Sequence, residues 1–259
     1  MRFLSRIRMP LAGVGLLALL TIVVVDVPGW ARWSAISVFV VGMALYFRVG
    51  RPTGAPVSIA SPVRGRWIAL NSPSSRVPSH GLQAWAQAYA LDLVCDPGDG
   101  SRPGFGWWPP ARRPDEFPGF GRPVHAPVTG VVVRSHAAAR DHLSRTSPVA
   151  LLYLVVESVR ELLGPLGVLG NHVVIRRDDR ACVLVAHLRR RSLRVRRGDR
   201  VEAGTVIGAC GNSGNSTEPH VHVQAMDRPS VWIAAGLPLL IDGREPPANG
   251  SLLAITSAG

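Results

Sequence analysis

Residues Gly211 to Gln224 read GNSGNSTEPHVHVQ, a polar loop that runs directly into an alternating segment. Alternation with a period of two is typical of a β-strand, in which residues two apart project from the same face. We therefore expect His220 and His222 to point together into one cleft, about 7 Å apart along the backbone. The preceding Gly, Asn and Ser residues favour a tight loop that can rim a substrate groove. Two histidines on a strand are weak evidence alone, because such pairs are common on solvated faces.

Short β-branched runs, divided by glycine and proline, occupy much of the chain around this segment. Runs at this spacing are typical of an all-β sandwich or barrel-like core. We predict a mainly β fold with an antiparallel, sandwich-like core. The runs are VTGVVV, NHVVIRR, CVLVAHL, LRVRRGDRV, TVIGACG and HVHVQAM.

One segment departs from the strand pattern. Ser147 to Leu163 (SPVALLYLVVESVRELL) has apolar residues at helical spacing, with proline near its start and Gly164-Pro165 at its stop. We interpret it as the centre of a helical insertion, about residues 137–168, between two strands. It is either a packed surface helix or a lid or membrane-contacting element.

Two uncharged apolar runs open the chain, Met9 to Val25 and Trp33 to Phe47. The DVPGWAR segment between them contains the proline, glycine and charges that stop a continuous helix. Each run is shorter than the ~20 residues that span a bilayer, but flanking arginines and tryptophans extend its reach. We predict a membrane anchor over residues 1–52, with transmembrane helices at about 9–25 and 33–49.

The alternative interpretation of this region is a signal peptide, because Arg2, Arg6 and Arg8 precede an apolar stretch. A second apolar run follows and a small-residue cleavage site does not, so we favour the hairpin. Residues 53–78 are rich in Pro, Gly and Ser, which predicts a linker. Residues 79–259 then form the remaining domain.

The net charge of +12 comes from arginine, since the chain has no lysine. Such a charge implies attraction to an anionic partner, either nucleic acid, phospholipid head groups or acidic wall polymers. Zinc-finger spacing, heptads and aromatic stacking platforms are absent from the sequence, so we expect no nucleic-acid partner. The three cysteines do not form a disulfide framework. Cys182 and Cys210 either pair in an oxidising compartment or remain buried free thiols.

Further candidate ligands occur far from the first histidine pair. His187 lies inside an apolar strand, where a solvated histidine is out of place. Asp92 sits between Leu91 and Leu93, and a carboxylate in an apolar strand must be paired, hydrogen-bonded or bound to metal. His80 precedes this strand. Three nitrogen or oxygen ligands and an exchangeable water are the arrangement of a catalytic zinc site.

Three motifs carry a resemblance to a known family: the AHL segment, the V-x-x-G-D-x-V-x-x-G-x-x-I-G run and the S-T-E-P-H-V-H strand. They resemble the lysostaphin and LytM-like zinc endopeptidases, peptidoglycan hydrolases with a β-sheet core. FGRPVHAPVTGVVV and GNHVVI resemble the family's strands on either side of the insertion. The resemblance runs from about Ser79 to Met226 and is interrupted by the helical insertion.

The resemblance implies that His80, Asp92 and His222 bind Zn²⁺ and that His187 and His220 are an uncoordinated catalytic pair. It leaves open which of the pair is the general base. The family's first motif places histidine and aspartate four residues apart, whereas here GLQAWAQAYAL separates them, which makes His80 the least secure ligand. Four histidines match no ligand position and are interpreted as surface or structural residues. They are His125, His136, His142 and His172.

The implied function is that of a membrane-anchored zinc metalloendopeptidase that cuts peptide cross-links of bacterial cell-wall peptidoglycan. The alternative is a catalytically inactive regulator or wall-binding module that activates other hydrolases. A lipoyl or biotinyl carrier, suggested by LRVRRGDRVEAGTVIG, is excluded because its cofactor attaches to lysine.

Arginines flank both ends of the hairpin, which favours cytoplasmic termini, whereas a wall hydrolase must face outward. We expect an extracytoplasmic domain, and a single span by the first run removes the conflict. Oligomeric state and the bond cleaved stay open.

Overall fold

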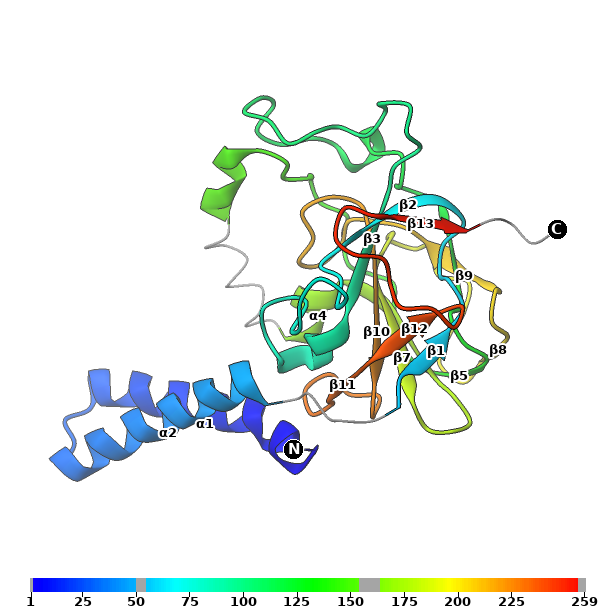
Figure 1. Cartoon of the computed structure of the whole chain (residues 1–259). Helices are drawn as coiled ribbons and strands as arrows, with labels where there is room; N and C mark the ends of the chain where they lie inside the picture. Colours follow the sequence, from blue (N-terminus) through cyan, green and yellow to red (C-terminus); the bar gives the residue numbers. More distant parts are fainter. Residues whose placement is uncertain (1, 50–54, 154–163, 256–259) are drawn as a thin grey trace.

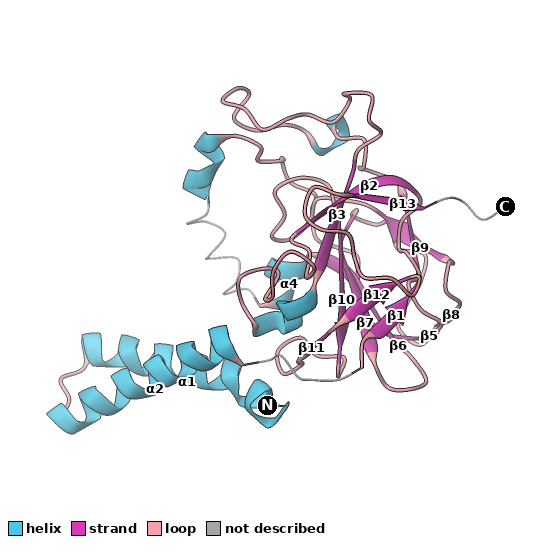
Figure 2. Cartoon of the chain, viewed as in Figure 1, coloured by secondary structure: helices cyan, strands magenta, loops and turns pink. Residues whose placement is uncertain are grey.

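The structure is a computed structural model that describes residues 2–49, 55–153 and 164–255. A helical hairpin forms one end of the molecule and a β-rich domain forms the rest (Figure 1). Coloured by secondary structure, the domain consists mostly of strands and loops, with short helical turns beside the sheet (Figure 2). The predicted mainly β, antiparallel fold is therefore confirmed.

The main sheet has nine strands in the order β13-β2-β3-β10-β7-β6-β5-β8, and β11 pairs with β10. All of these neighbours are antiparallel. The strands are β2 (Gly65–Leu70), β3 (Leu91–Cys95), β5 (Gly130–His136), β6 (Asn171–Arg176), β7 (Cys182–Leu188), β8 (Arg200–Val201), β10 (Val221–Met226), β11 (Gly236–Leu237) and β13 (Leu252–Ile255).

Two small sheets cover one face of the main sheet. They are the parallel pair β1 (Val57–Ile59) and β12 (Leu239–Ile241), and the antiparallel pair β4 (Pro123–His125) and β9 (Val206–Ala209). Their apolar side chains form one buried core with those of the main sheet. The domain is thus a sandwich around this core.

A second buried cluster lies on the opposite face of the main sheet. It contains residues of the 3-10 helix η1 (Ala84–Tyr89) and of helix α4 (Pro165–Leu169). Strand β7 contributes to both faces, since Val183 and Val185 belong to the first core and Leu184 and Ala186 to the second. Burial on both faces explains why the CVLVAHL run is continuously apolar instead of alternating.

The composition of residues 53–78 predicts a linker, but these residues contain the strands β1 and β2. Trp67 of β2 is only 1% exposed and belongs to the first core. Strands of three and six residues are too short to stand out among prolines and glycines. Of the predicted strand LRVRRGDRV, only Arg200–Val201 is a strand, because a turn at Arg196–Asp199 interrupts it.

The predicted helical insertion is only partly covered by the described residues. Its start is a 3-10 helix, η3 (Pro148–Tyr153), and residues 154–163 lie outside the description. Gly164-Pro165 marks the start of α4, with proline at an initial position of the helix where its missing N–H costs nothing. A further 3-10 turn, η2 (Pro114–Glu116), lies in the loop before β4.

The hairpin consists of α1 (Arg2–Val24) and α2 (Gly29–Arg48), which both begin earlier than predicted. Both helices are long and apolar enough to cross a membrane, with mean hydropathies of 2.1 and 1.3. They approach each other closely at Gly15 and Gly42. A Cβ on Gly15 would lie 2.5 Å from the Cα of Phe39, and one on Gly42 would lie 2.7 Å from that of Ala12. Small residues at a helix crossing are typical of membrane hairpins.

The three cysteines are free and buried. Cys182 belongs to the core cluster on one face of the main sheet and Cys210 to the cluster on the other. This arrangement agrees with buried thiols.

Candidate active site

Sheet register brings three of the five predicted site residues together. In the antiparallel pair β10–β3, His222 lies opposite Asp92, and in the pair β10–β7 it lies opposite Ala186, the neighbour of His187. His220 precedes β10 and forms an isolated bridge with Gly211. His80 arrives from the loop before η1. All five side chains therefore meet at one end of the central strands.

Asp92 lies at the centre of this cluster. Its Oδ1 is 2.8 Å from Nδ1 of His222 and 3.5 Å from Nε2 of His220, and its Oδ2 is 3.1 Å from Nε2 of His80. Potential ligand atoms of His80, Asp92 and His222 all lie within 4.8 Å of one another. The rings of His187 and His220 are 4.6 Å apart between centroids, and those of His187 and His222 are 5.6 Å apart.

Hydrogen bonds on the far side of two rings fix which nitrogen carries the proton. Nδ1 of His187 lies 2.8 Å from the carbonyl oxygen of Ser213, and Nδ1 of His220 lies 2.8 Å from that of Glu218. A carbonyl oxygen only accepts, so both Nδ1 atoms donate. In the neutral rings, Nε2 then carries a lone pair.

His80 is held in the same way through a serine. Nδ1 of His80 is 3.0 Å from the hydroxyl of Ser79, and this hydroxyl donates to the carbonyl oxygen of Ala90 at 2.7 Å. The serine oxygen therefore accepts from Nδ1, and the lone pair on Nε2 faces Asp92.

His222 has the opposite tautomer. Its Nε2 lies 2.9 Å from Oε1 of Gln224, and the amide nitrogen of Gln224 donates to the carbonyl oxygen of Trp85 at 2.9 Å. The carbonyl of Trp85 fixes the orientation of the amide, so Nε2 of His222 donates to it. The lone pair on Nδ1 consequently points at Asp92.

This arrangement fits a divalent metal ion. Neutral His80 and His222 both aim a lone pair at the Asp92 carboxylate, and such acceptors are stable at this range only around a cation or an added proton. Two imidazole nitrogens and one carboxylate are a donor set that suits zinc. Asn71 donates to Oδ2 of Asp92 at 2.8 Å and so orients the carboxylate.

Burial and neighbouring charge separate the pKa values of the cluster. Burial alone would raise the pKa of Asp92, but when the rings around it are protonated, attraction to His80 and His220 and hydrogen bonding to His220 and His222 outweigh burial, so this pKa lies well below its usual value. Burial lowers the pKa of His80, and burial with the neighbouring His220 and His222 lowers that of His187 well below the ordinary range.

The pKa of His220 is shifted the other way. Burial lowers it, but the charge of Asp92 and hydrogen bonds to Asp92 and Glu218 outweigh burial and raise it. A cation on Asp92 would oppose this rise. Without such a cation, His220 holds a proton more readily than His187.

Backbone strain accompanies the cluster. His187 has a φ of 59°, a left-handed conformation that is uncommon for a residue other than glycine. Its conformation is braced by Ser213, whose hydroxyl donates to the carbonyl oxygen of Leu188 at 2.8 Å and whose own carbonyl accepts from His187. Strain of this kind persists where surrounding contacts hold it, often at functional sites.

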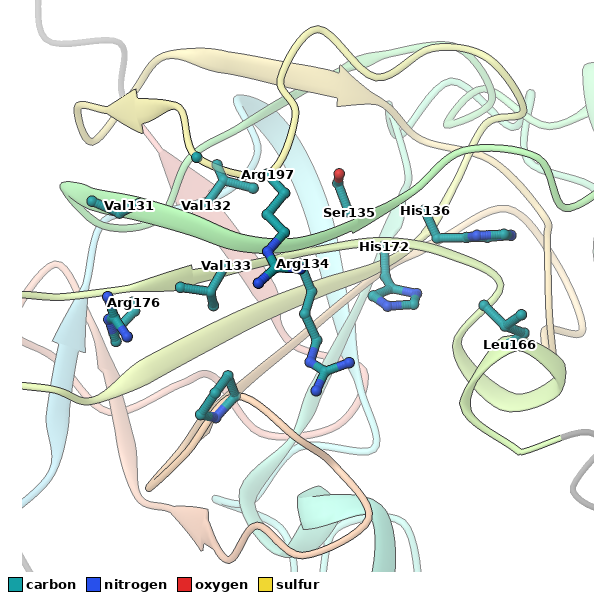
Figure 3. A pocket seen from close by; sticks show the side chains of 12 residues that line it. Val131, Val132, Val133, Arg134, Ser135, His136, Leu166, His172, Arg176 and Arg197 are labelled. Carbon is teal, nitrogen blue, oxygen red and sulfur yellow. The ribbon is translucent and has the colours of Figure 1, made fainter.

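The remaining four histidines make no direct contact with Asp92, although His142 is joined to His220 through Asn212 and Ser216. His136 and His172 stack on neighbouring strands with ring centroids 6.2 Å apart. They line a hollow of about 650 Å³ with Arg134, Arg176 and Arg197, and none of the five cluster residues lines it (Figure 3). His142 contacts the carbonyl oxygen of Gly214 at 2.8 Å, and His125 belongs to β4.

Sequence reasoning missed the residues that orient the cluster. Gln224 follows His222 by two positions, so the same strand alternation that related His220 to His222 could have identified it. Asn71, Ser79 and the carbonyl of Trp85 give no such signal, because loop conformation alone brings them to the site.

Comparisons with known proteins identify one peptidase family. The sequence model of Peptidase family M23 matches residues 116–231, a range that contains His187, His220 and His222 and begins after His80 and Asp92. No curated protein matches the chain.

Several solved structures are similar. The catalytic domain of lysostaphin from Staphylococcus simulans is 21% identical over 57% of this chain and 74% of its own, with a TM-score of 0.33. The deep-sea M23 metalloprotease pseudoalterin is 18% identical over 66% and 71%, with a TM-score of 0.34. A putative M23 peptidase from Pseudomonas aeruginosa is 19% identical over 73% and 55%, with a TM-score of 0.35.

Proposed function

The β-rich domain belongs to peptidase family M23, as its motifs predict, and on this premise we propose that the chain is a zinc-dependent endopeptidase of bacterial peptidoglycan. The observation that carries the proposal is the convergence of nitrogens of His80, His220 and His222 on the buried Asp92 carboxylate. Without a cation, these nitrogens would need added protons to face the carboxylate, whereas a metal ion accommodates the neutral rings and the anion together.

In this proposal His80 through Nε2, Asp92 through its carboxylate and His222 through Nδ1 hold the zinc ion. When bound, zinc lowers the pKa of a water to about 7 and polarises the carbonyl of the scissile bond. Asn71 and Gln224 keep the carboxylate and the His222 ring in orientation. His187 and His220 remain uncoordinated.

His187 and His220 then move the protons. Each ring donates from Nδ1 to a backbone carbonyl, of Ser213 and Glu218 respectively, so its Nε2 faces the site and is unprotonated when the ring is neutral. One ring accepts a proton from the attacking water, and its carbonyl partner stabilises the resulting imidazolium. The other ring, protonated at Nε2, donates a hydrogen bond to the negative oxygen of the tetrahedral intermediate, and the proton accepted by the first ring passes to the leaving amine. Both assignments of the two rings satisfy this geometry.

Peptidoglycan is the proposed substrate because of the M23 motifs and the apolar hairpin, which would keep the domain at a membrane surface. We place the domain on the extracytoplasmic side, where the wall lies. Protease digestion of the domain in intact spheroplasts tests this placement, since a cytoplasmic domain would be protected. Mass spectrometry of products released from purified sacculi would identify the bond cleaved, in glycine bridges or in stem peptides.

Metal content and wall lysis together test the function. We expect the purified full chain to contain one zinc per molecule and to solubilise sacculi. His220→Ala should abolish lysis while zinc remains bound, because this residue is not a ligand in the proposal. Retained lysis would remove His220 from the mechanism, and a wild-type chain that holds no zinc would instead indicate the inactive regulator.

A further inference from the structure

The hairpin is anchored to the domain by a buried arginine. Arg8 of α1 is fully buried, and its guanidinium donates to the carbonyl oxygens of Val49 at 2.6 Å and Ala234 at 2.7 Å. Val49 follows α2, and Ala234 belongs to the loop before β11. One side chain therefore joins both ends of the hairpin to the domain.

A second contact lies beside it. Nε1 of Trp85 donates to the hydroxyl of Tyr46 in α2 at 3.0 Å. Met9 and Tyr46 pack against the buried cluster that contains Trp85, and the Trp85 ring lies 4.9 Å from that of Trp232. The hairpin thus covers the η1 segment directly.

The η1 segment is held in an unfavourable backbone conformation. Trp85 and Ala86 have φ values of 57° and 62°, in the left-handed region. A Cβ on Gly236 of β11 would lie 2.6 Å from the carbonyl oxygen of Ala86, so β11 packs closely against the backbone of η1. Such a conformation needs surrounding contacts to persist, and Tyr46 supplies one of them.

The same segment orients a proposed metal ligand. The carbonyl oxygen of Trp85 accepts from the amide of Gln224, and the other end of this amide accepts from His222. Trp85 therefore links the hairpin to the site through two different groups: its indole N–H donates to Tyr46, and its backbone carbonyl accepts from Gln224, which binds His222.

We propose that Tyr46, Trp85 and Gln224 are positioning residues for the zinc site, so that the membrane hairpin is part of its scaffold. This inference rests on the proposed zinc function. Gln224 keeps the proton of His222 on Nε2 and its lone pair on Nδ1, toward the metal. Loss of such an outer contact typically costs 10–100-fold in metal affinity.

Zinc affinity of the full chain in detergent micelles tests the inference. We expect Gln224→Leu, which removes both amide contacts, to weaken Zn²⁺ binding by about 10–100-fold. Tyr46→Phe removes only the hydroxyl and should weaken it a few-fold, as expected for one hydrogen bond. A competing chelating dye measures both values.

The matched control is Thr21→Val. It also removes a single hydroxyl from the hairpin, one that donates to the carbonyl oxygen of Leu17 away from the domain. It should leave Zn²⁺ affinity unchanged. The visible absorption of the Co²⁺-loaded protein should shift in Tyr46→Phe and Gln224→Leu and should match the wild type in Thr21→Val.

A double substitution shows whether Tyr46 affects zinc binding through Gln224 or through a general loosening of the domain. Gln224→Glu keeps an acceptor for His222 but loses the donor to Trp85, so it should recover affinity relative to Gln224→Leu. In that background Tyr46→Phe should have no further effect, because the connection is already broken. Coupling is supported by this non-additivity.

Two results would overturn the inference. One is a Tyr46→Phe protein with the Zn²⁺ affinity and Co²⁺ spectrum of Thr21→Val. The other is an equal effect of Tyr46→Phe with glutamine or glutamate at position 224. In both cases wild-type zinc binding would stand, so the proposed function would survive. Absence of zinc from the wild type would instead reject the proposed function.

Discussion

The central strands and the loop before them place the same site by different means. Register in the main sheet positions Asp92, His187 and His222. The irregular segment 79–90 positions His80 and the Trp85 carbonyl through isolated hydrogen bonds and left-handed backbone. Residues fixed by a sheet keep their geometry as long as the domain folds, whereas residues fixed by a loop depend on every contact that holds the loop. The site therefore has a rigid part, which consists of Asp92, His187 and His222 on the sheet. It also has a conditional part, which consists of His80 and the Trp85 carbonyl in segment 79–90.

The largest effect should come from the rigid part. Asp92→Asn removes the carboxylate on which three imidazoles converge, and we expect zinc binding and wall lysis to be lost entirely. Metal analysis by mass spectrometry measures the first and sacculus turbidity the second. Asp178→Asn, on the exposed β6–β7 turn, is the control and should bind one zinc. Stoichiometric zinc in Asp92→Asn would contradict the assignment of this residue as a ligand.

A comparison of two histidine ligands sharpens the distinction. We expect His222→Ala to bind zinc about tenfold more weakly than His80→Ala. His80 contributes less to affinity because a loop residue must be ordered before it can bind. Competitive chelator titration of both variants measures the difference. If the two variants lose equal affinity, the loop is as well ordered as the sheet and the comparison fails.

Outer contacts should have smaller effects. Asn71→Ala removes the donor to Oδ2 of Asp92, and we expect about a tenfold loss in zinc affinity with the fold intact. Circular dichroism checks the fold and chelator titration checks the affinity. An unchanged affinity would mean that the strand alone orients Asp92.

His172 provides an acid-dependent loss of stability that arises away from the proposed zinc site. Burial lowers the pKa of His172 to about 4, with smaller contributions from His136 and Arg134. The unfolded chain therefore takes up this proton first. Stability should fall as the pH drops from about 6.5 toward 4, by at most about 3 kcal/mol from this group.

Urea unfolding of the metal-free protein between pH 7 and 4 measures this loss. His172→Gln should make the dependence shallower in this window, and the lowered pKa values of His80 and His187 account for part of the slope that remains. Equal slopes for wild type and His172→Gln would show that other groups cause the acid loss.

The sequence predicted the rigid part well and the conditional part poorly, for a physical reason. Alternation in HVHVQ relates His220 to His222 locally, and a lone aspartate in an apolar strand demands a partner wherever the strand packs. Nothing local indicates that Trp85 turns left-handed or that its carbonyl reaches Gln224. The hairpin was visible in composition, but its attachment through Arg8 was not, since an arginine near an apolar run looks like an interfacial anchor.

The most direct test of the whole account is anomalous diffraction at the zinc edge from crystals of the full chain. The account predicts a single zinc peak bounded by His80, Asp92 and His222, with His187 and His220 beside it but uncoordinated. A peak ligated by His187 or His220, or zinc-soaked crystals with an empty cluster, would contradict it.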